Sequence, residues 1–279
     1  MKTVTIEELL VWAFVHELPK GGGADGLDNI HSAWRQLEAS SWGKVLGYAE
    51  LMTLVDRDRP SPGTWVEQGA PHEDALEVGR AVADLTKYDV MFPEGWNPVG
   101  DWSEQGDLTR DAVARAVERF SLRPAGKRGA SIVSLVISTA ILGRVPDYTA
   151  PEPECEVFKR GGLHPSWFMQ RQAVDAFGRE YSVEIDGYNR RSHRPYRGAY
   201  QKFILTPDPL SDILGRIDYQ IWAAALKVLE SAVANTLTDH RLTFSTLSAT
   251  PWNEEKDMLG IQLFRAFQGE NVYHPEKAY

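Results

Sequence analysis

The clearest alternation of apolar and polar residues in the chain lies at residues 180–188. Its apolar members are Tyr181, Val183 and Ile185, and the residues between them are polar. This period of two predicts a strand with one buried face and one wet face. Residues 167–174 and 199–206 are also rich in strand formers, and turn residues separate the three segments. The pattern predicts a three-stranded antiparallel meander over residues 167–206.

Spacings of three and four residues between apolar positions dominate the rest of the chain. The longest such pattern, at residues 209–237, predicts a helix that backs the meander. Further helices are expected at 5–18, 30–51, 73–85, 108–120 and 254–267, a buried helix or strand at 130–145, and a strand at 241–247. Thr5 and Glu8 form a capping-box pattern at the first helix. The predicted fold class is α+β and predominantly helical, with the C-terminal half holding a three-stranded antiparallel meander backed by a long helix.

Composition divides the chain into two regions. A proline-rich stretch at residues 146–153 suggests a boundary, with an acidic and mainly helical region at 1–147. The second region, 148–279, is expected to be α+β, with the meander, the long helix and a polar tail. The chain has 279 residues and a net charge of −9, and 43% of its residues are hydrophobic, which is ample for a core.

Cysteine content and hydropathy bear on location. The single cysteine, Cys155, excludes an intrachain disulfide. No apolar run is long enough to cross a bilayer, and the N-terminus does not read as a signal peptide. We therefore expect a cytoplasmic protein without a membrane partner. The sequence does not indicate an oligomeric state.

Positive charge is concentrated in one loop between the second and third predicted strands. The candidate binding residues there are Tyr188, Arg190, Arg191, His193, Arg194, Tyr196, Arg197, Tyr200 and Lys202, and no acidic residue lies between Gly187 and Pro207. Guanidinium groups match phosphate and carboxylate geometry, and tyrosine rings stack on bases. The loop therefore predicts contact with nucleic acid or with a host protein. The alternative is that these cations pair with the protein's own acids or keep an edge loop soluble.

Enzymatic readings rest on weaker patterns. His193, with Glu184 and Asp186 nearby, is the place to look for phosphodiester hydrolysis. The loop at residues 92–107 could stack a sugar, using the aromatic and acidic residues Trp96, Asp101, Trp102, Glu104 and Asp107. The glycine-rich segment 20–26 lacks the Gly-Lys-Ser/Thr of a phosphate loop. The histidines show no metal-ligand spacing, so neither a metal nor a cofactor is expected.

Three stretches carry a family resemblance. They are EELLVWAFVHEL near the N-terminus, EIDGYNRRSHRPYRGAYQKFILTPDP in the centre, and DYQIWAAALKVLESAVANTLTDHRLT followed by Pro251-Trp252. They resemble a group of uncharacterised proteins carried in prophage regions of alphaproteobacteria, over about half of the chain. The resemblance implies a phage setting, so that the expected cytoplasm is that of a host bacterial cell. It implies no chemistry. The resulting expectation is a phage-encoded, non-enzymatic binding or regulatory protein, with a hydrolase or a phage assembly component as alternatives.

Overall fold

The structure is a computed structural model, and it describes residues 1–18, 70–103, 106–161, 164–243, 247–253 and 260–266. The helix expected at 30–51 and the segment 20–26 lie outside the described residues. Within the described part, helix accounts for 42% and strand for 22% of residues, in five α-helices and several small sheets. The expectation of a predominantly helical fold is therefore wrong, because short strand pairs recur throughout the chain.

The chain forms two compact units that interleave along the sequence. Unit 1 comprises Met1–Pro98, Arg119–Tyr148 and Gly215–Tyr279, and unit 2 comprises Val99–Glu118 and Thr149–Leu214. One border, between Tyr148 and Thr149, falls in the proline-rich stretch. The division at residues 147 and 148, which was drawn from composition and charge, stays a prediction.

Unit 1 begins with a short strand and a capped helix. Strand β1 spans Lys2–Val4, and helix α1 spans Ile6–Val11 before continuing as the π-helix η1 over Trp12–Glu17. The backbone N–H of Glu8 donates to Thr5 Oγ1 at 3.3 Å, and the N–H of Thr5 donates to Glu8 Oε2 at 3.1 Å. The predicted capping box is confirmed, and it satisfies two N–H groups that the first turn leaves free.

Two more helices of unit 1, α4 and α6, pack against this start. Helix α4 spans Glu73–Asp84, as predicted, and leads through the 3₁₀ turn η3 at Leu85–Lys87 into strand β2 at Tyr88–Met91. Helix α6 spans Ala125–Leu142, so the apolar segment near 130–145 is a helix. Gly129 brings α6 against the backbone of Thr86 so closely that a Cβ there would collide with the Thr86 carbonyl.

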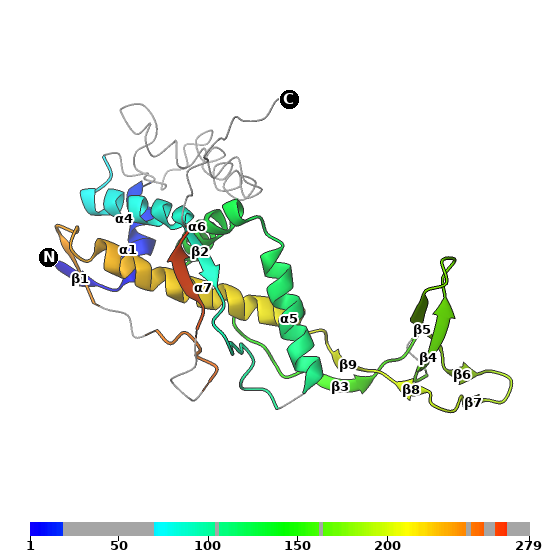
Figure 1. The fold of residues 1–279 in the computed structure, drawn as a ribbon. Coiled ribbons are helices and arrows are strands. Elements are labelled where there is room, and N and C mark those ends of the chain that lie inside the picture. Colours follow the sequence, from blue (N-terminus) through cyan, green and yellow to red (C-terminus); the bar gives the residue numbers. More distant parts are fainter. Residues whose placement is uncertain (19–69, 104–105, 162–163, 244–246, 254–259, 267–279) are drawn as a thin grey trace, which may run out of the picture. The chain divides into compact units, whose positions relative to one another are not determined.

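Helix α7, at Leu210–Val233, is the long helix that the apolar spacing predicts, and it supplies the largest share of the core. Its buried hydrophobic members are Ile213, Ile217, Tyr219, Ile221, Trp222, Ala223, Ala225, Leu226, Leu229 and Val233. After α7, strand β10 at His240–Leu242 pairs in parallel with β1, and strand β11 at Gln262–Arg265 pairs antiparallel with β2 (Figure 1). The helix expected over 254–267 is wrong at β11, since strand pairing there overrides the local apolar spacing.

Unit 2 is built from one helix and small antiparallel sheets. Helix α5 spans Asp107–Ser121 and crosses the border between the units, and strand β3 at Glu154–Val157 pairs with β9 at Phe203–Thr206. Strand β4 at Trp167–Val174 and strand β5 at Glu180–Asp186 form the predicted hairpin (Figure 1). Its turn is closed by Asp175, whose Oδ1 accepts the N–H groups of Phe177 and Arg179 at 2.8 Å each.

The third predicted strand does not complete a meander. It is split into β8 at Tyr200–Gln201, which pairs with β4, and β9, which pairs with β3, so the sheet order is β5-β4-β8. Gly187, which follows β5, lies close to the backbone of β4, and its N–H donates to the Trp167 carbonyl at 2.8 Å. A Cβ on Gly187 would lie 2.8 Å from the Phe168 carbonyl and 2.9 Å from the Ala199 Cβ. Period-two patterning predicts strands but not their partners.

Two further expectations for the sheet were a buried apolar face on the strand at 180–188 and a long helix packed behind it, and neither is met. Tyr181, on the supposed buried face, is 49% exposed, and Val183 and Ile185 are only half-buried. Most of α7 belongs to unit 1, whereas the sheet belongs to unit 2. The idea of one long helix backing this sheet is therefore not supported by the division of the chain.

Candidate functional site

The basic loop, defined as residues 187–199, has a regular structure of its own. Strand β6 at Tyr188–Asn189 pairs antiparallel with β7 at Arg194–Pro195, which makes a small hairpin. Its turn is held by Asn189, whose Oδ1 accepts the N–H groups of Arg191 at 3.0 Å and Ser192 at 3.2 Å. His193 has a φ of 53°, the left-handed conformation that closes the turn.

Backbone hydrogen bonds also fasten the base of the loop. The N–H of Tyr196 donates to the Gly187 carbonyl at 2.8 Å, and the N–H of Ala199 donates to the Tyr196 carbonyl at 3.0 Å. Asp186 Oδ1 accepts the N–H of Tyr188 at 3.0 Å. Gly198, with a φ of 83°, turns the chain into β8. The arginines are thus presented from an ordered backbone, which reduces the entropy lost when a ligand binds.

Three arginines of the loop have no ion-pair partner among the residues that the structure describes. Arg191, Arg194 and Arg197 are exposed, and within the described residues no carboxylate lies at ion-pair distance from them. Arg190 has only a long contact, with its Nη2 lying 3.9 Å from Asp186 Oδ2 and its side chain 89% exposed. The alternative that the loop cations pair with the protein's own acids therefore finds no support at Arg191, Arg194 and Arg197.

Lys202 and Tyr200 differ from the arginines because both contact Glu184. Lys202 Nζ lies 2.7 Å from Glu184 Oε1, and the Tyr200 hydroxyl donates to Glu184 Oε2 at 2.8 Å. The hydrogen bond from Lys202 is the main reason that the pKa of Glu184 falls below its usual value, and the bond to Glu184 raises the pKa of Tyr200. These two of the nine predicted residues serve the sheet next to the loop and are not free to bind.

The remaining aromatic residues of the loop divide by exposure. Tyr196 is 45% exposed and follows β7, so its ring is available for stacking. Tyr188 is half-buried at the base of the hairpin. The structure therefore gathers four arginines and one open ring in the loop, with Tyr188 as support.

The structure does not bring together the residues expected for phosphodiester hydrolysis, which are His193, Glu184 and Asp186. In the described part of the chain His193 forms no hydrogen bond to Glu184 or Asp186, and Lys202 and Tyr200 already occupy Glu184. A general base needs a partner within hydrogen-bonding reach, so His193 is not set up as one.

The two tryptophans of the expected sugar site make internal hydrogen bonds instead. Trp102 is 8% exposed, and its Nε1 donates to the Ala150 carbonyl at 2.9 Å. Trp96 Nε1 donates to Gln220 Oε1 at 2.8 Å. The two residues belong to different units. As predicted, residues 92–103 form neither helix nor strand.

The described residues offer neither a metal-binding cluster nor a membrane-spanning helix beside the basic loop. Among the described residues no three His, Cys, Asp or Glu side chains converge in a way that could hold a metal ion. None of the helices in that part of the chain is long and apolar enough to cross a membrane.

Sequence reasoning missed residues that act through geometry. Asn189 and Gly187 shape the basic loop, and neither was a candidate, although an Asn two residues before an exposed turn is a local signal for such a cap. The pairing of Lys202 with Glu184 has no signal in the sequence, because it joins a residue of β5 to a residue between β8 and β9. No family model, no curated protein and no solved structure matches this chain.

Proposed function

We propose that the protein is a non-enzymatic nucleic-acid-binding protein that holds the phosphate backbone through the basic loop. The observation that carries this proposal is the set of three exposed arginines, Arg191, Arg194 and Arg197, for which the described residues supply no counter-charge. Guanidinium groups in a fixed hairpin can donate paired hydrogen bonds to successive phosphates. The phage setting rests on the sequence resemblance alone and forms part of the proposal.

One feature of the loop favours a nucleic acid as the partner, and the net charge of the chain decides how that contact should depend on salt. The exposed ring of Tyr196 lies among the arginines, and a cationic groove with an aromatic face is the usual means of holding single strands without sequence preference. The net charge of −9 repels polyanions at long range, so the contact should be local and weaken with salt.

The test is fluorescence anisotropy with labelled single-stranded and duplex oligonucleotides over a range of salt concentrations. Wild-type protein should bind, and the triple substitution R191A/R194A/R197A should abolish binding at moderate salt. If three phosphates are released, the slope of log affinity against log salt should fall by about 2 for single strands and about 3 for duplex.

A matched control removes the same charge elsewhere. Arg80, Arg144 and Arg241 are exposed residues of unit 1, and their triple substitution to Ala should leave binding near the wild-type value. Equal loss in both triple variants would mean that net charge alone matters, and absence of wild-type binding at low salt would reject the nucleic acid as partner. A pull-down from nuclease-treated host lysate gives a further check. A host protein that is captured by the wild type but not by the R191A/R194A/R197A variant would reject the nucleic acid in favour of a protein partner.

A further inference from the structure

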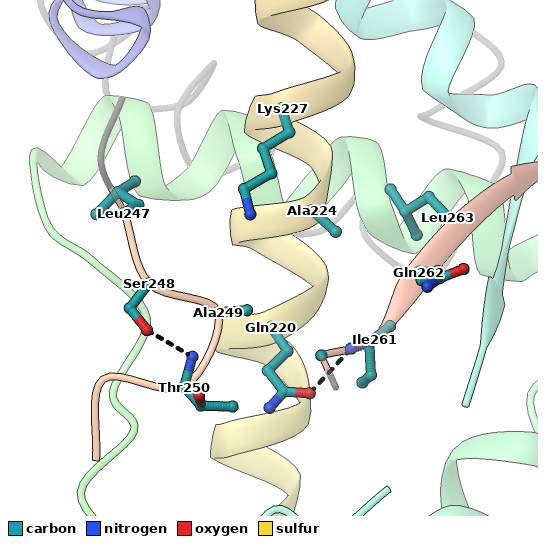
Figure 2. Close-up of a pocket in the computed structure, with 11 residues that line it drawn as sticks. Gln220, Ala224, Lys227, Leu247, Ser248, Ala249, Thr250, Ile261, Gln262 and Leu263 are labelled. Carbon is teal, nitrogen blue, oxygen red and sulfur yellow. Dashed lines mark hydrogen bonds between the residues drawn. The ribbon is translucent and has the colours of Figure 1, made fainter. Parts of the chain in front are cut away.

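A second candidate site lies in unit 1, beside the long helix α7 (Figure 2). A cavity of about 610 Å³ opens between α7, the segment at 247–250 and the start of β11. Its volume lies within the range of about 300 to 1,000 Å³ that is usual for small-molecule sites. Helix α7 contributes Gln220, Ala224 and Lys227 to its lining, and residues 247–250 and 260–263 form the rest.

Gln220 supplies a buried hydrogen-bond donor without an acceptor. The side chain is 1% exposed, and its Oε1 accepts from Trp96 Nε1 at 2.8 Å and from the Ile261 N–H at 3.2 Å. Both of those groups can only donate, so the amide oxygen must face them and the amide nitrogen must face away. Figure 2 shows this orientation, and Nε2 has no hydrogen-bond partner among the described residues. Less than 1 Å² of this nitrogen is accessible to solvent, so an acceptor from outside the protein reaches it after a small shift of the side chains around it.

Lys227 supplies a positive charge in the same cavity. It lies seven residues after Gln220, two helical turns further along the same face of α7, at a separation of about 10 Å along the axis. Its side chain extends back along the helix toward Gln220 (Figure 2). The described lining residues include no carboxylate, and no ion pair joins Lys227 to another described residue.

The wall between the two polar groups is apolar. Ala224 lies midway on the helix, and Leu247, Ala249, Ile261 and Leu263 line the cavity from the other segments. A single cation matches one negative charge, and burying a second charge at Gln220 without a counter-ion would be unfavourable. The buried end of a ligand should therefore be a neutral acceptor such as an amide or ketone oxygen.

From this arrangement we propose that the cavity binds a small, elongated carboxylate, with its anionic end at Lys227 and a neutral carbonyl oxygen at Gln220 Nε2. An aliphatic chain bridging these ends covers the apolar wall. The site is separate from the basic loop, so the proposal does not depend on nucleic-acid binding.

The probe is 6-acetamidohexanoate, which carries a carboxylate and an amide carbonyl at opposite ends of a short chain. Titration calorimetry and thermal melting should detect its binding to the full-length protein at concentrations up to ~10 mM, at which a site with a Kd of ~1 mM is mostly filled. Octanoate, which lacks the carbonyl, and 6-acetamidohexanamide, which lacks the charge, should each bind about tenfold more weakly.

Two substitutions connect these effects to the two residues. Lys227→Gln removes the charge at an exposed position and should weaken 6-acetamidohexanoate about tenfold without affecting the neutral amide. Gln220→Met keeps the length of the side chain and removes the amide donor, so the probe should lose its advantage over octanoate. It also removes the acceptor of the Trp96 and Ile261 N–H groups, and a thermal melt shows whether the variant folds. Lys87→Gln, an exposed lysine outside the cavity, should change nothing.

The proposal is overturned if wild-type protein binds none of the three probes in this range. It is equally overturned if Lys227→Gln binds 6-acetamidohexanoate as well as the wild type does. Because Lys227 is exposed, the Lys227→Gln protein should melt at the same temperature as the wild type. Loss of binding in that variant can then not be attributed to unfolding.

Discussion

Two charged regions of the molecule, one in each unit, use their charge in opposite ways. In unit 1 the carboxylate of Asp74 is 1% exposed and accepts five hydrogen bonds, which come from the Thr238 N–H and Oγ1, the Asp239 N–H, and the His240 N–H and Nδ1. In unit 2 the guanidinium groups of Arg191, Arg194 and Arg197 are exposed and have no acidic partner within the described part of the chain.

The difference separates charge that builds the protein from charge that is open to a partner. Asp74 lies in the first turn of helix α4 and ties it to the start of strand β10, so the fold depends on its negative charge. The arginines are held only through their backbone, and their side chains contribute little to stability. Substitutions should therefore produce a large stability effect in the first region and almost none in the second.

Asp74→Ala should give the largest effect, lowering the free energy of unfolding by about 3–5 kcal/mol, because it leaves a group of donors without an acceptor. Urea denaturation followed by tryptophan fluorescence measures this loss. The matched control is Glu73→Ala, which removes the same charge from the exposed neighbour at the start of the same helix and should cost at most ~1 kcal/mol. Similar losses in the two variants would contradict the structural role of Asp74.

Gly129→Ala should be the next most harmful change, costing about 1–3 kcal/mol, because the added methyl would collide with the Thr86 backbone. The same substitution at Gly79 in α4 is the comparison, since a Cβ there meets only the Leu18 side chain at 3.5 Å. Gly79→Ala should therefore stabilise the protein by about 0.5–1 kcal/mol through helix propensity. Thermal melts of both variants should move in opposite directions from the wild type.

Acid should remove the contribution of Asp74 in a defined pH range. Burial alone would raise the pKa of this carboxyl, but the hydrogen bonds from Thr238, His240 and Asp239 outweigh burial and hold the pKa well below 3.8. The unfolded chain therefore takes up the proton first as the pH falls below 3.8, and the folded state loses about 1.4 kcal/mol per pH unit. Above that pH the contribution is complete.

Urea titrations at several pH values below 5 can isolate this effect. The stability difference between wild type and Asp74→Ala should narrow by that same slope as the pH falls, since the variant has no carboxylate to protonate. A constant difference across the range would show that the pKa of Asp74 is not depressed.

The triple substitution R191A/R194A/R197A should have the smallest effect, changing the free energy of unfolding by less than about 0.5 kcal/mol. Arg128→Ala gives the contrast, because Arg128 Nη2 lies 2.7 Å from the largely buried Asp89 Oδ2 and its loss should cost about 1.5–3 kcal/mol. A large drop in melting temperature for the triple variant would mean that the arginines are structural and that the basic loop is not a binding surface.

Local patterns were sufficient for much of the secondary structure. The capping box at Thr5, the hairpin turn at Asp175 and the helices α4 and α7 all depend on contacts within a few residues, and all appear as predicted. The concentration of arginines in one loop was also visible in the sequence, because it is a property of consecutive residues.

Long-range pairing was beyond those patterns. The strand β11 lies where the apolar spacing indicated a helix, and the third strand of the expected meander divides between β4 and β3. Which arginines remain unpaired, which lysine is taken by Glu184, and which amide of α7 is left without an acceptor depend on residues far apart in the chain. By itself the sequence determined the local elements and the location of the charge, since neighbouring residues set backbone preferences. Only the tertiary structure decided strand partners and free polar groups, because these depend on which distant atoms come within about 3 Å of one another.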